Sequence, residues 1–210
     1  MGTYIRCMHG LGDNIYIRGY ARSIYDQGND LIIETPWPEL YCDFAGVKFV
    51  KPETRLRTQA KNIQHSLHRW SEESCRNHNT IRPSYGRELS AKSIPQIMQQ
   101  QFGCIPTYSW PWGTWRENID GKPIAVIRPS TLRHEWFNIA RAPLPEYLCA
   151  ISELLRDRYH IISIADIDDK EEWLDGCAPY CDECYNRGEL PIADIISLVA
   201  GCSLLVGRVS

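Results

Sequence analysis

The sequence predicts an α/β protein with two domains, each built on a parallel sheet, the second of them incomplete. Three observations lead to this prediction. The 210 residues suffice for two compact domains or one large one. A strand, a glycine turn, a helix and a strand follow one another at the start of the chain. A second alternation of strands and helices begins at Lys122. We therefore expect domains at 1–121 and 122–210.

The first domain opens with a βαβ pattern. Residues 3–9 have the character of a short buried strand, and the apolar spacing predicts a helix over about 13–27, ended by Gly28. The apolar segments 31–33 and 47–50 are the next expected strands. Because a strand–helix–strand connection normally joins parallel strands, this pattern favours a parallel sheet.

The rest of the first domain is basic. Residues 48–92 contain ten Lys and Arg against four Glu, a local formal charge of +6. This stretch could bind nucleic acid or an anionic glycolipid, but we favour a solvated face that balances an acidic segment later in the chain. The whole chain carries a formal charge of −3, which argues against electrostatic binding of nucleic acid by the chain as a whole. A helix is expected over 87–102, where Pro95 could interrupt it.

An irregular aromatic connector is expected between the two domains, over residues 106–115. It carries Trp110, Trp112 and Trp115. These indoles could stack on a sugar or a base, although such residues more often pack a domain hinge.

The second domain repeats the alternation. Residues 124–127 and 161–164 are expected strands, separated by a long loop over 128–142 and an amphipathic helix over 145–158. Pro145 suits the first turn of that helix.

The end of the chain is first acidic and then apolar. Residues 168–189 contain eight carboxylates against two basic residues, a local charge of −6. A helix over 192–200 and a strand over 203–206 follow, and the sequence stops directly after that strand. A doubly wound domain normally continues into a helix at such a point, so we expect the second domain to be cut short.

The sharpest candidate site is the glycine turn between the first strand and the first helix. Gly10 and Gly12 let the backbone approach a ligand, and the N–H groups at the start of the helix, up to Asn14, can bind an anion or a hydroxyl. Asp13 would lie at the carboxyl end of the first strand, where open α/β sheets bind their ligands. Asp13 could equally be only a helix cap, and the third glycine of a dinucleotide-binding fingerprint is missing.

Three segments resemble a known family. His9-Gly-Leu-Gly-Asp13, followed by a helix and Asp30-Leu-Ile-Ile-Glu-Thr-Pro36, resembles the opening of the family 9 glycosyltransferases, the lipopolysaccharide heptosyltransferases and their relatives. Ile127-Arg-Pro-Ser-Thr-Leu-Arg-His-Glu-Trp136 resembles the family's strand–loop segment, and 188–207 resembles the stretch before its donor-binding motif. The run from Arg128 to Trp136 is also similar to uncharacterised glycosyltransferase-like proteins of bacteriophages, and this second likeness is the closer one.

The resemblance implies a fold, a reaction and a set of residue roles. The fold is GT-B-like, with two Rossmann-like domains. The reaction moves a sugar from a nucleotide-sugar donor to an acceptor hydroxyl, inverting and metal-independent, without a cofactor. Asp13 is then the catalytic base, and Gly10, Gly12 and Asn14 form the acceptor-side loop. The donor phosphates are then bound by the segment after the strand at 124–127. Its candidate residues are Arg128, Ser130, Thr131, Arg133 and His134. The family's lysine is absent, so Arg133 and His134 would replace it.

Other interpretations stay open at these positions. Ser130 and Thr131 could form only a turn or a cap, and Arg133 with Glu135 could be a surface ion pair. The alternative function is a non-catalytic, phage-encoded binding protein of the same fold that contacts nucleic acid or a host protein. For the enzyme, the acceptor could be a glycolipid, a glycan or a modified nucleic acid, and a homo-oligomer is conceivable.

Nine cysteines are scattered along the chain, and no apolar segment is long enough to span a membrane. The amino-terminal residues lack the apolar core of a signal peptide, so a cytoplasmic location is expected, in a bacterial or phage-infected cell. We expect most cysteines to be reduced and buried. Cys177, Cys181 and Cys184 match the spacing of a radical-SAM cluster or part of a zinc clip, but we expect metal-free thiols, because no fourth ligand lies at a standard spacing.

Overall fold

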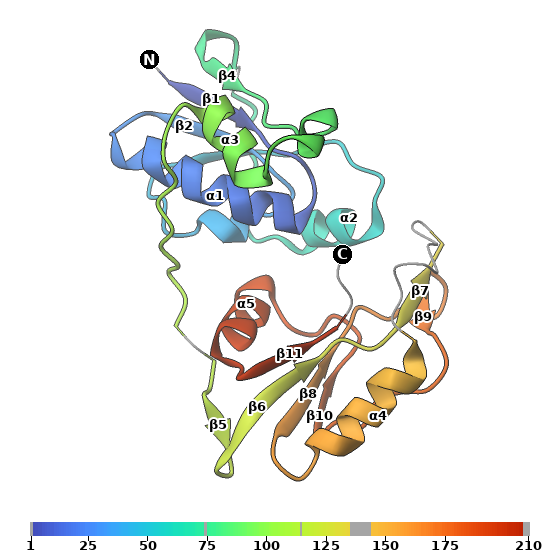
Figure 1. Cartoon of the computed structure of the whole chain (residues 1–210). Coiled ribbons are helices and arrows are strands. Elements are labelled where there is room, and N and C mark those ends of the chain that lie inside the picture. Colours follow the sequence, from blue (N-terminus) through green and yellow to red (C-terminus); the bar gives the residue numbers. More distant parts are fainter. Residues whose placement is uncertain (1, 74, 114, 135–143, 208–210) are drawn as a thin grey trace. The chain divides into compact units, whose positions relative to one another are not determined.

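The computed structural model describes residues 2–73, 75–113, 115–134 and 144–207 (Figure 1). The chain divides into two compact units, Met1–Pro111 and Trp112–Ser210. Both are mixed α/β structures on parallel sheets, as the sequence predicts. The division falls at residue 111 rather than 121, because β5 (Asn118–Ile119) pairs with the second sheet.

The first unit is built on a parallel sheet in the order β3-β2-β1-β4. Its strands are β1 (Thr3–Arg6), β2 (Leu31–Glu34), β3 (Lys48–Val50) and β4 (Asn79–Ile81), and its helices are α1 (Leu11–Asp26), α2 (Arg57–His65) and α3 (Ile94–Phe102). The strands and the helix of the predicted βαβ pattern are thus confirmed. Ile5, Ile33 and Tyr20 are fully buried, so α1 covers a closed apolar core.

The helix expected over 87–102 starts later than predicted. Arg87–Ser90 is a short 3-10 segment, and α3 begins only at Ile94. The reason is local: Ser93 and Gln96 form a capping box, and Pro95 occupies the first turn, where its missing N–H costs nothing. Pro95 therefore starts the helix instead of interrupting it.

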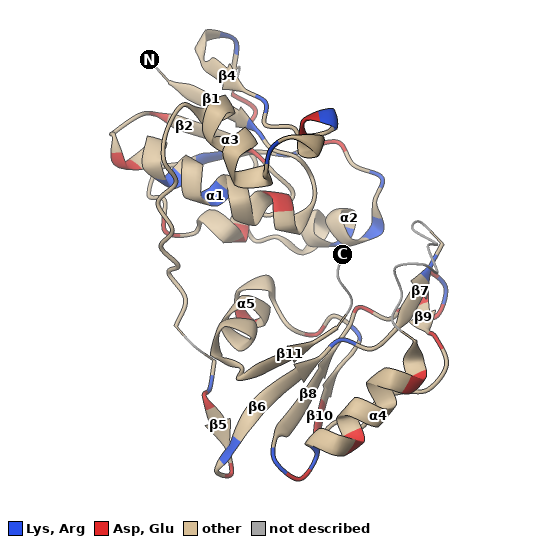
Figure 2. Cartoon of the chain, viewed as in Figure 1, with Lys and Arg blue, Asp and Glu red and all other residues tan. Residues whose placement is uncertain are grey.

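The basic stretch 48–92 does not form one element. Its Lys and Arg residues are spread over β3, α2, 3-10 segments and loops of the first unit (Figure 2). Lys48 pairs with Glu73, so part of the charge is balanced inside the stretch.

Half of the expected connector belongs to the first unit, because residues 105–110 pack along α1. The Thr107 N–H donates to the Gly19 carbonyl at 2.9 Å, and the Ser23 hydroxyl donates to the Ile105 carbonyl at 2.6 Å. Arg18, only 2% exposed, forms a two-point ion pair with Asp43. Its guanidinium also donates to the Ser109 carbonyl at 2.9 Å and lies over the Trp110 ring. Trp110 therefore packs on the first unit.

The close approach at Gly19 gives a testable expectation. An alanine Cβ there would lie 2.8 Å from the Tyr108 ring and 3.0 Å from Pro106 Cβ. Gly→Ala inside a helix normally stabilises by about 1 kcal/mol. We expect Gly19→Ala to destabilise instead, by about 1–2 kcal/mol, because overpacking outweighs helix propensity. Gly12→Ala in the same helix is the matched control, since its Cβ would meet no atom within 4 Å. Chemical denaturation of the wild type and the two variants measures the change in the free energy of unfolding. A stabilised Gly19→Ala variant would show that the connector does not pack on α1.

The second unit is built on a parallel sheet in the order β10-β8-β6-β11, with β5 antiparallel to β6. Its strands are β6 (Lys122–Ile127), β8 (His160–Ile164), β10 (Glu183–Tyr185) and β11 (Leu204–Val206), and its helices are α4 (Pro145–Leu155) and α5 (Ile192–Gly201). Leu198 of α5 packs on one face of the sheet with Ile124, and Leu155 of α4 packs on the other with Ala125. The sheet is therefore covered by helices on both faces.

The two sheets share one topology. When only the four mutually parallel strands of each unit are numbered in chain order, they run 3-2-1-4, the order with which doubly wound nucleotide-binding folds begin. The second and third strands are added on one side of the first strand, and the fourth is added on its other side. The switch point therefore lies between the first and fourth strands, which are β1 and β4 in one unit and β6 and β11 in the other. Ligands of such sheets bind at the carboxyl ends of the strands beside this switch point.

The loop expected over 128–142 and the acidic stretch 168–189 are not wholly irregular. Thr131–Arg133 forms β7, which pairs antiparallel with β9 (Glu172–Leu174), and the acidic stretch also contains β10. Arg133 faces Glu172 in this pairing, so a cross-strand charge pair stabilises a strand that the local pattern does not reveal. Residues 135–143, including Glu135 and Trp136, lie outside the described residues.

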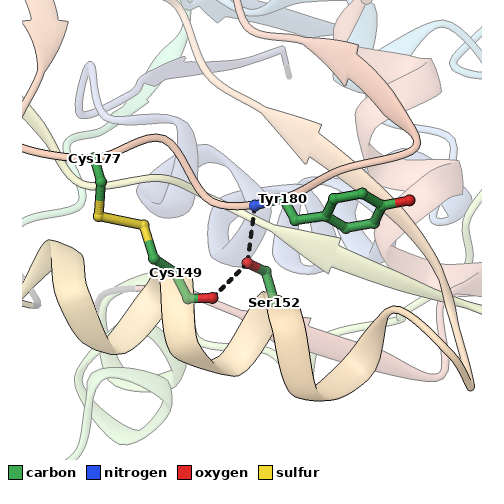
Figure 3. Close-up of a disulfide and its surroundings, with 4 residues drawn as sticks. All are labelled: Cys149, Ser152, Cys177 and Tyr180. Atoms are coloured by element: carbon green, nitrogen blue, oxygen red, sulfur yellow. Dashed lines mark hydrogen bonds between the residues drawn. A yellow bond between two sulfur atoms is a disulfide. The ribbon is translucent and has the colours of Figure 1, made fainter.

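The expectation of buried, mostly reduced cysteines is partly wrong. Cys149 on α4 forms a disulfide with Cys177 (Figure 3). Among the free cysteines of the described residues, only Cys7 is buried. Next to the disulfide, the fully buried Ser152 accepts a hydrogen bond from the Tyr180 N–H and donates one to the Cys149 carbonyl, each at 2.8 Å. The loop that follows β9 is thereby held on α4 at two points.

The described residues contain no group of three or more His, Cys, Asp and Glu side chains that could hold a metal ion. Cys177 is engaged in the disulfide, so it does not form a three-thiol cluster with Cys181 and Cys184. The absence of metal stays a prediction. No helix within the described part of the chain is long and apolar enough to cross a membrane.

Candidate functional site

The candidate catalytic turn lies at the switch point of the first sheet. Gly10 is the N-cap of α1, and Asp13 lies in the first turn of that helix, after β1. The interpretation of Asp13 as the helix cap is therefore wrong, since Gly10 occupies the cap position. Asp13 is half-buried, so its carboxylate is held by the protein and still reaches solvent.

Tyr85 contacts the Asp13 carboxylate. The Tyr85 hydroxyl donates a hydrogen bond to Asp13 Oδ1, and Tyr85 follows β4, the strand beside β1. Burial, followed by the hydrogen bond to Asp13, raises the pKa of Tyr85 to about 12. The hydroxyl therefore keeps its proton at neutral pH and can act as a permanent donor to the carboxylate.

A second interaction fixes the position of Tyr85. Gln101 on α3 forms two hydrogen bonds with the backbone of the preceding residue: its Oε1 accepts from the Ser84 N–H at 2.9 Å, and its Nε2 donates to the Ser84 carbonyl at 2.7 Å. Two bonds to one residue restrain both its position and its orientation. The helix α3 thus sets where the Tyr85 hydroxyl meets Asp13.

The two glycines of the turn have different roles. A Cβ at Gly10 would lie 2.5 Å from Asp13 Oδ2, so the carboxylate folds back over Gly10 and would have to shift if this residue carried a side chain. A Cβ at Gly12 would meet no atom within 4 Å. Gly12 is exposed, so the surface beside the carboxylate can admit a ligand.

Asn14, expected on the acceptor side of the loop, is a structural residue. It is fully buried, and its Nδ2 donates to the carbonyls of Met8 and Gly10 at 2.6 and 2.8 Å. Its Oδ1 accepts from the Thr35 hydroxyl at 2.7 Å. All of these bonds hold the turn in shape, so Asn14 positions Asp13 rather than binding a ligand.

In the second unit, the candidate phosphate-binding residues converge on a carboxylate that the sequence does not single out. Glu172 is fully buried. Its Oε1 accepts from Arg128 Nη2 at 3.0 Å and from the Thr131 hydroxyl at 2.7 Å, and Arg133 Nε lies 3.3 Å from Oε2. Two guanidinium groups thus share one carboxylate.

The remaining two residues of this segment differ in burial. Ser130 is 2% exposed, and within the described residues its hydroxyl has no hydrogen-bond partner. His134 is exposed, and its ring lies 4.9 Å from that of Trp173 on β9. Of the predicted residues, Arg128, Thr131 and Arg133 are therefore brought together, while Ser130 lies beneath the surface and His134 upon it.

The sequence analysis did not identify Tyr85 or Glu172, because each lies far along the chain from the residue that it contacts. Tyr85 lies 72 residues after Asp13, and Glu172 lies 44 residues after Arg128. Glu172 stands in an acidic stretch whose composition indicates a solvated face. The segment around Trp173 has two adjacent apolar residues and no alternation, and three residues are too few to distinguish a strand from a loop.

The two units define the class of this protein: an α/β protein with parallel sheets in the strand order of nucleotide-binding folds. No protein-family model matches the chain, and no curated protein matches it. Among solved structures, the chain is similar to the bacterial iron-containing dodecameric glycosyltransferase TibC from enterotoxigenic E. coli H10407, with a TM-score of 0.57 and 11% sequence identity. The match covers 99% of this chain and 53% of that one, so the chain spans about half the length of TibC. At this identity the likeness shows the fold alone, and membership of family 9 stays a prediction.

Proposed function

We propose that the protein takes part in glycosyl transfer, moving a sugar from a nucleotide-sugar donor to an acceptor hydroxyl with inversion and without a metal ion. One observation carries the proposal: a half-buried carboxylate with a fixed hydroxyl donor lies at the switch point of a sheet whose fold is like that of a solved glycosyltransferase.

In this reaction Asp13 accepts the proton of the acceptor hydroxyl. The acceptor oxygen then bonds to the anomeric carbon, and the bond from that carbon to the diphosphate breaks, so the nucleoside diphosphate leaves with the electron pair. Tyr85 does not touch the reacting atoms in this scheme. As a positioning residue, it occupies Oδ1 of Asp13 and directs the other oxygen to the acceptor.

The leaving diphosphate needs positive charge and hydrogen-bond donors. Arg128 and Arg133 supply the charge, and Glu172 holds the two guanidinium groups near each other in fixed orientations. Thr131 is committed to Glu172 and stabilises this arrangement, whereas the exposed His134 is free to meet the ligand.

TibC is described as dodecameric and iron-containing. Assembly of this chain into a homo-oligomer is compatible with the proposal. Among the described residues, no three His, Cys, Asp or Glu side chains form a group that could hold a metal ion.

Glu172 also favours a second candidate, a non-catalytic binding protein of the same fold. A fully buried carboxylate already neutralises part of the charge that a diphosphate would meet. If the cluster is purely structural, donor binding at this segment is lost while the fold is kept.

The substitution Arg133→Ala tests the donor site. We expect it to weaken nucleoside diphosphate binding by about 1.5–3 kcal/mol, the scale of a hydrogen bond to a charged group. Arg158→Ala, which removes an exposed arginine after α4, is the matched control. Thermal shift against a panel of nucleoside diphosphates and nucleotide sugars measures the binding, since a ligand of the folded state raises the melting temperature. Equal shifts in both variants would remove the donor role of Arg133.

A further inference from the structure

The tryptophans of the connector separate between the two units. Trp110 lies over Arg18 in the first unit, whereas Trp112 and Trp115 belong to the second. There they line a hollow of about 430 Å³ together with Gly113, Asp194 and Ser197. The hollow is shallow and open to solvent, so a ligand there would lie against its wall rather than inside a closed cavity.

The wall formed by Trp115 is held in place by the core of its unit. The Trp115 N–H donates to the Ser197 carbonyl on α5 at 3.2 Å, and the indole lies 6.3 Å from the Tyr185 ring. The same side chain packs against the apolar cluster of Ile124, Val126, Ile162 and Leu198. A half-buried indole fixed in this way offers a preformed flat surface.

The polar group of the hollow is the Asp194 carboxylate. Asp194 lies in the first turn of α5, one turn before Ser197. Within the described residues, its carboxylate has no hydrogen bond and no ion pair, and no Lys or Arg lines the hollow. The site therefore combines a flat aromatic surface with an acceptor-only group, a combination that repels phosphate and suits a planar ligand with two adjacent donors.

We propose that this hollow binds a guanine base, stacked on an indole, with its N1–H and N2–H groups donated to the Asp194 carboxylate. Stacking on an aromatic ring serves every base, so the carboxylate decides the specificity. Guanine is the common base that presents two neighbouring donors on its Watson–Crick edge. Adenine and cytosine present an amino group beside an acceptor, and uracil presents one N–H between two carbonyls.

The role of this base site rests on the proposed function: in a glycosyltransferase, the guanine would belong to the nucleotide of the donor. The second unit is the one expected on the donor side. Since α5 follows β10, its first turn begins on the carboxyl side of the sheet, where such folds bind nucleotides.

Calorimetric titration of the full chain with nucleosides tests the base site alone, because a nucleoside carries no phosphate. We expect guanosine to bind best, and inosine, which lacks the N2 amine, to bind about tenfold more weakly. Trp112→Ala should weaken guanosine about tenfold or more. Asp194→Asn should reverse the preference towards xanthosine, whose C2 carbonyl accepts from the new amide N–H. Asp157→Asn, an exposed residue just after α4, is the matched control and should keep the preference for guanosine.

Several results would overturn the inference. Equal affinity for guanosine, adenosine and uridine would do so, as would an Asp194→Asn variant with unchanged preference. Saturable binding of free glucose or galactose that is lost in Asp194→Asn would assign the hollow to a sugar instead. Guanosine binding in a protein that turns over no nucleotide sugar would leave the base site standing and refute the glycosyltransferase proposal. Turnover of a sugar linked to another nucleotide, without guanosine binding, would refute the base site and leave the glycosyltransferase proposal standing.

Discussion

Asp13→Asn is expected to lower the turnover of a nucleotide sugar by about 10²–10⁴-fold, the contribution of a general base, and to leave the fold intact. Asn cannot take up the acceptor proton, but it has nearly the shape of Asp, and its amide oxygen can still accept from Tyr85. No cap is lost, because Gly10 is the N-cap of α1. Turnover and melting temperature of the two proteins, measured side by side, separate these effects.

Tyr85→Phe provides the internal comparison for this result. A positioning residue should contribute less than the base, so we expect a loss of about tenfold in the wild-type background and none in the Asp13→Asn background. Tyr147→Phe, on the exposed side of α4, controls for the loss of a tyrosine hydroxyl. Full activity of Asp13→Asn would refute the catalytic role, and a large fall in its melting temperature would make Asp13 structural.

The position of Asp13 could be predicted from sequence because every determinant is local. A buried strand, two glycines and an amphipathic helix follow one another within about 25 residues, and this order alone places the residue at the carboxyl end of a strand. Tyr85 depends on a different kind of information. It reaches Asp13 because β4 pairs with β1, and a three-residue strand in a basic stretch carries no periodic signal for that pairing.

For the candidate phosphate-binding segment 128–134, the sequence likewise shows the charged residues but not their partner. Arg128 and Arg133 are recognisable as a local concentration of positive charge, but their partner is not. Glu172 is one of eight carboxylates in its stretch, and only the pairing of β7 with β9 selects it for burial. Composition describes the stretch as solvated on average, whereas one member is fully buried because two arginines compensate it.

The disulfide was beyond prediction for a related reason: connectivity cannot be deduced from cysteine positions alone. Spacing draws attention to Cys177, Cys181 and Cys184 as neighbours in sequence. The partner of Cys177 is instead Cys149, on a helix that packs beside the loop only in the folded unit.

Loss of this disulfide is expected to destabilise the second unit by about 3–4 kcal/mol, because the bond closes a loop whose ends are separated by 28 residues and thereby restricts the unfolded chain. For a unit of this size, the melting temperature should fall by more than about 10 °C on reduction. The hydrogen bond from Tyr180 to Ser152 remains in the reduced protein and keeps the loop near α4, so the fold should persist at low temperature.

The measurement is hydrogen exchange of peptides from 144–207, with and without dithiothreitol, together with calorimetric melting. Peptide mapping under non-reducing conditions first establishes the Cys149–Cys177 bond. The double variant Cys149→Ser/Cys177→Ser is the matched control: it should match the reduced protein and show no response to dithiothreitol. Peptides of the first unit should keep their protection, because no disulfide joins described residues there. If the mapped bond is present and its reduction leaves exchange and melting unchanged, the loop is held by the Ser152 hydrogen bonds and not by the covalent link.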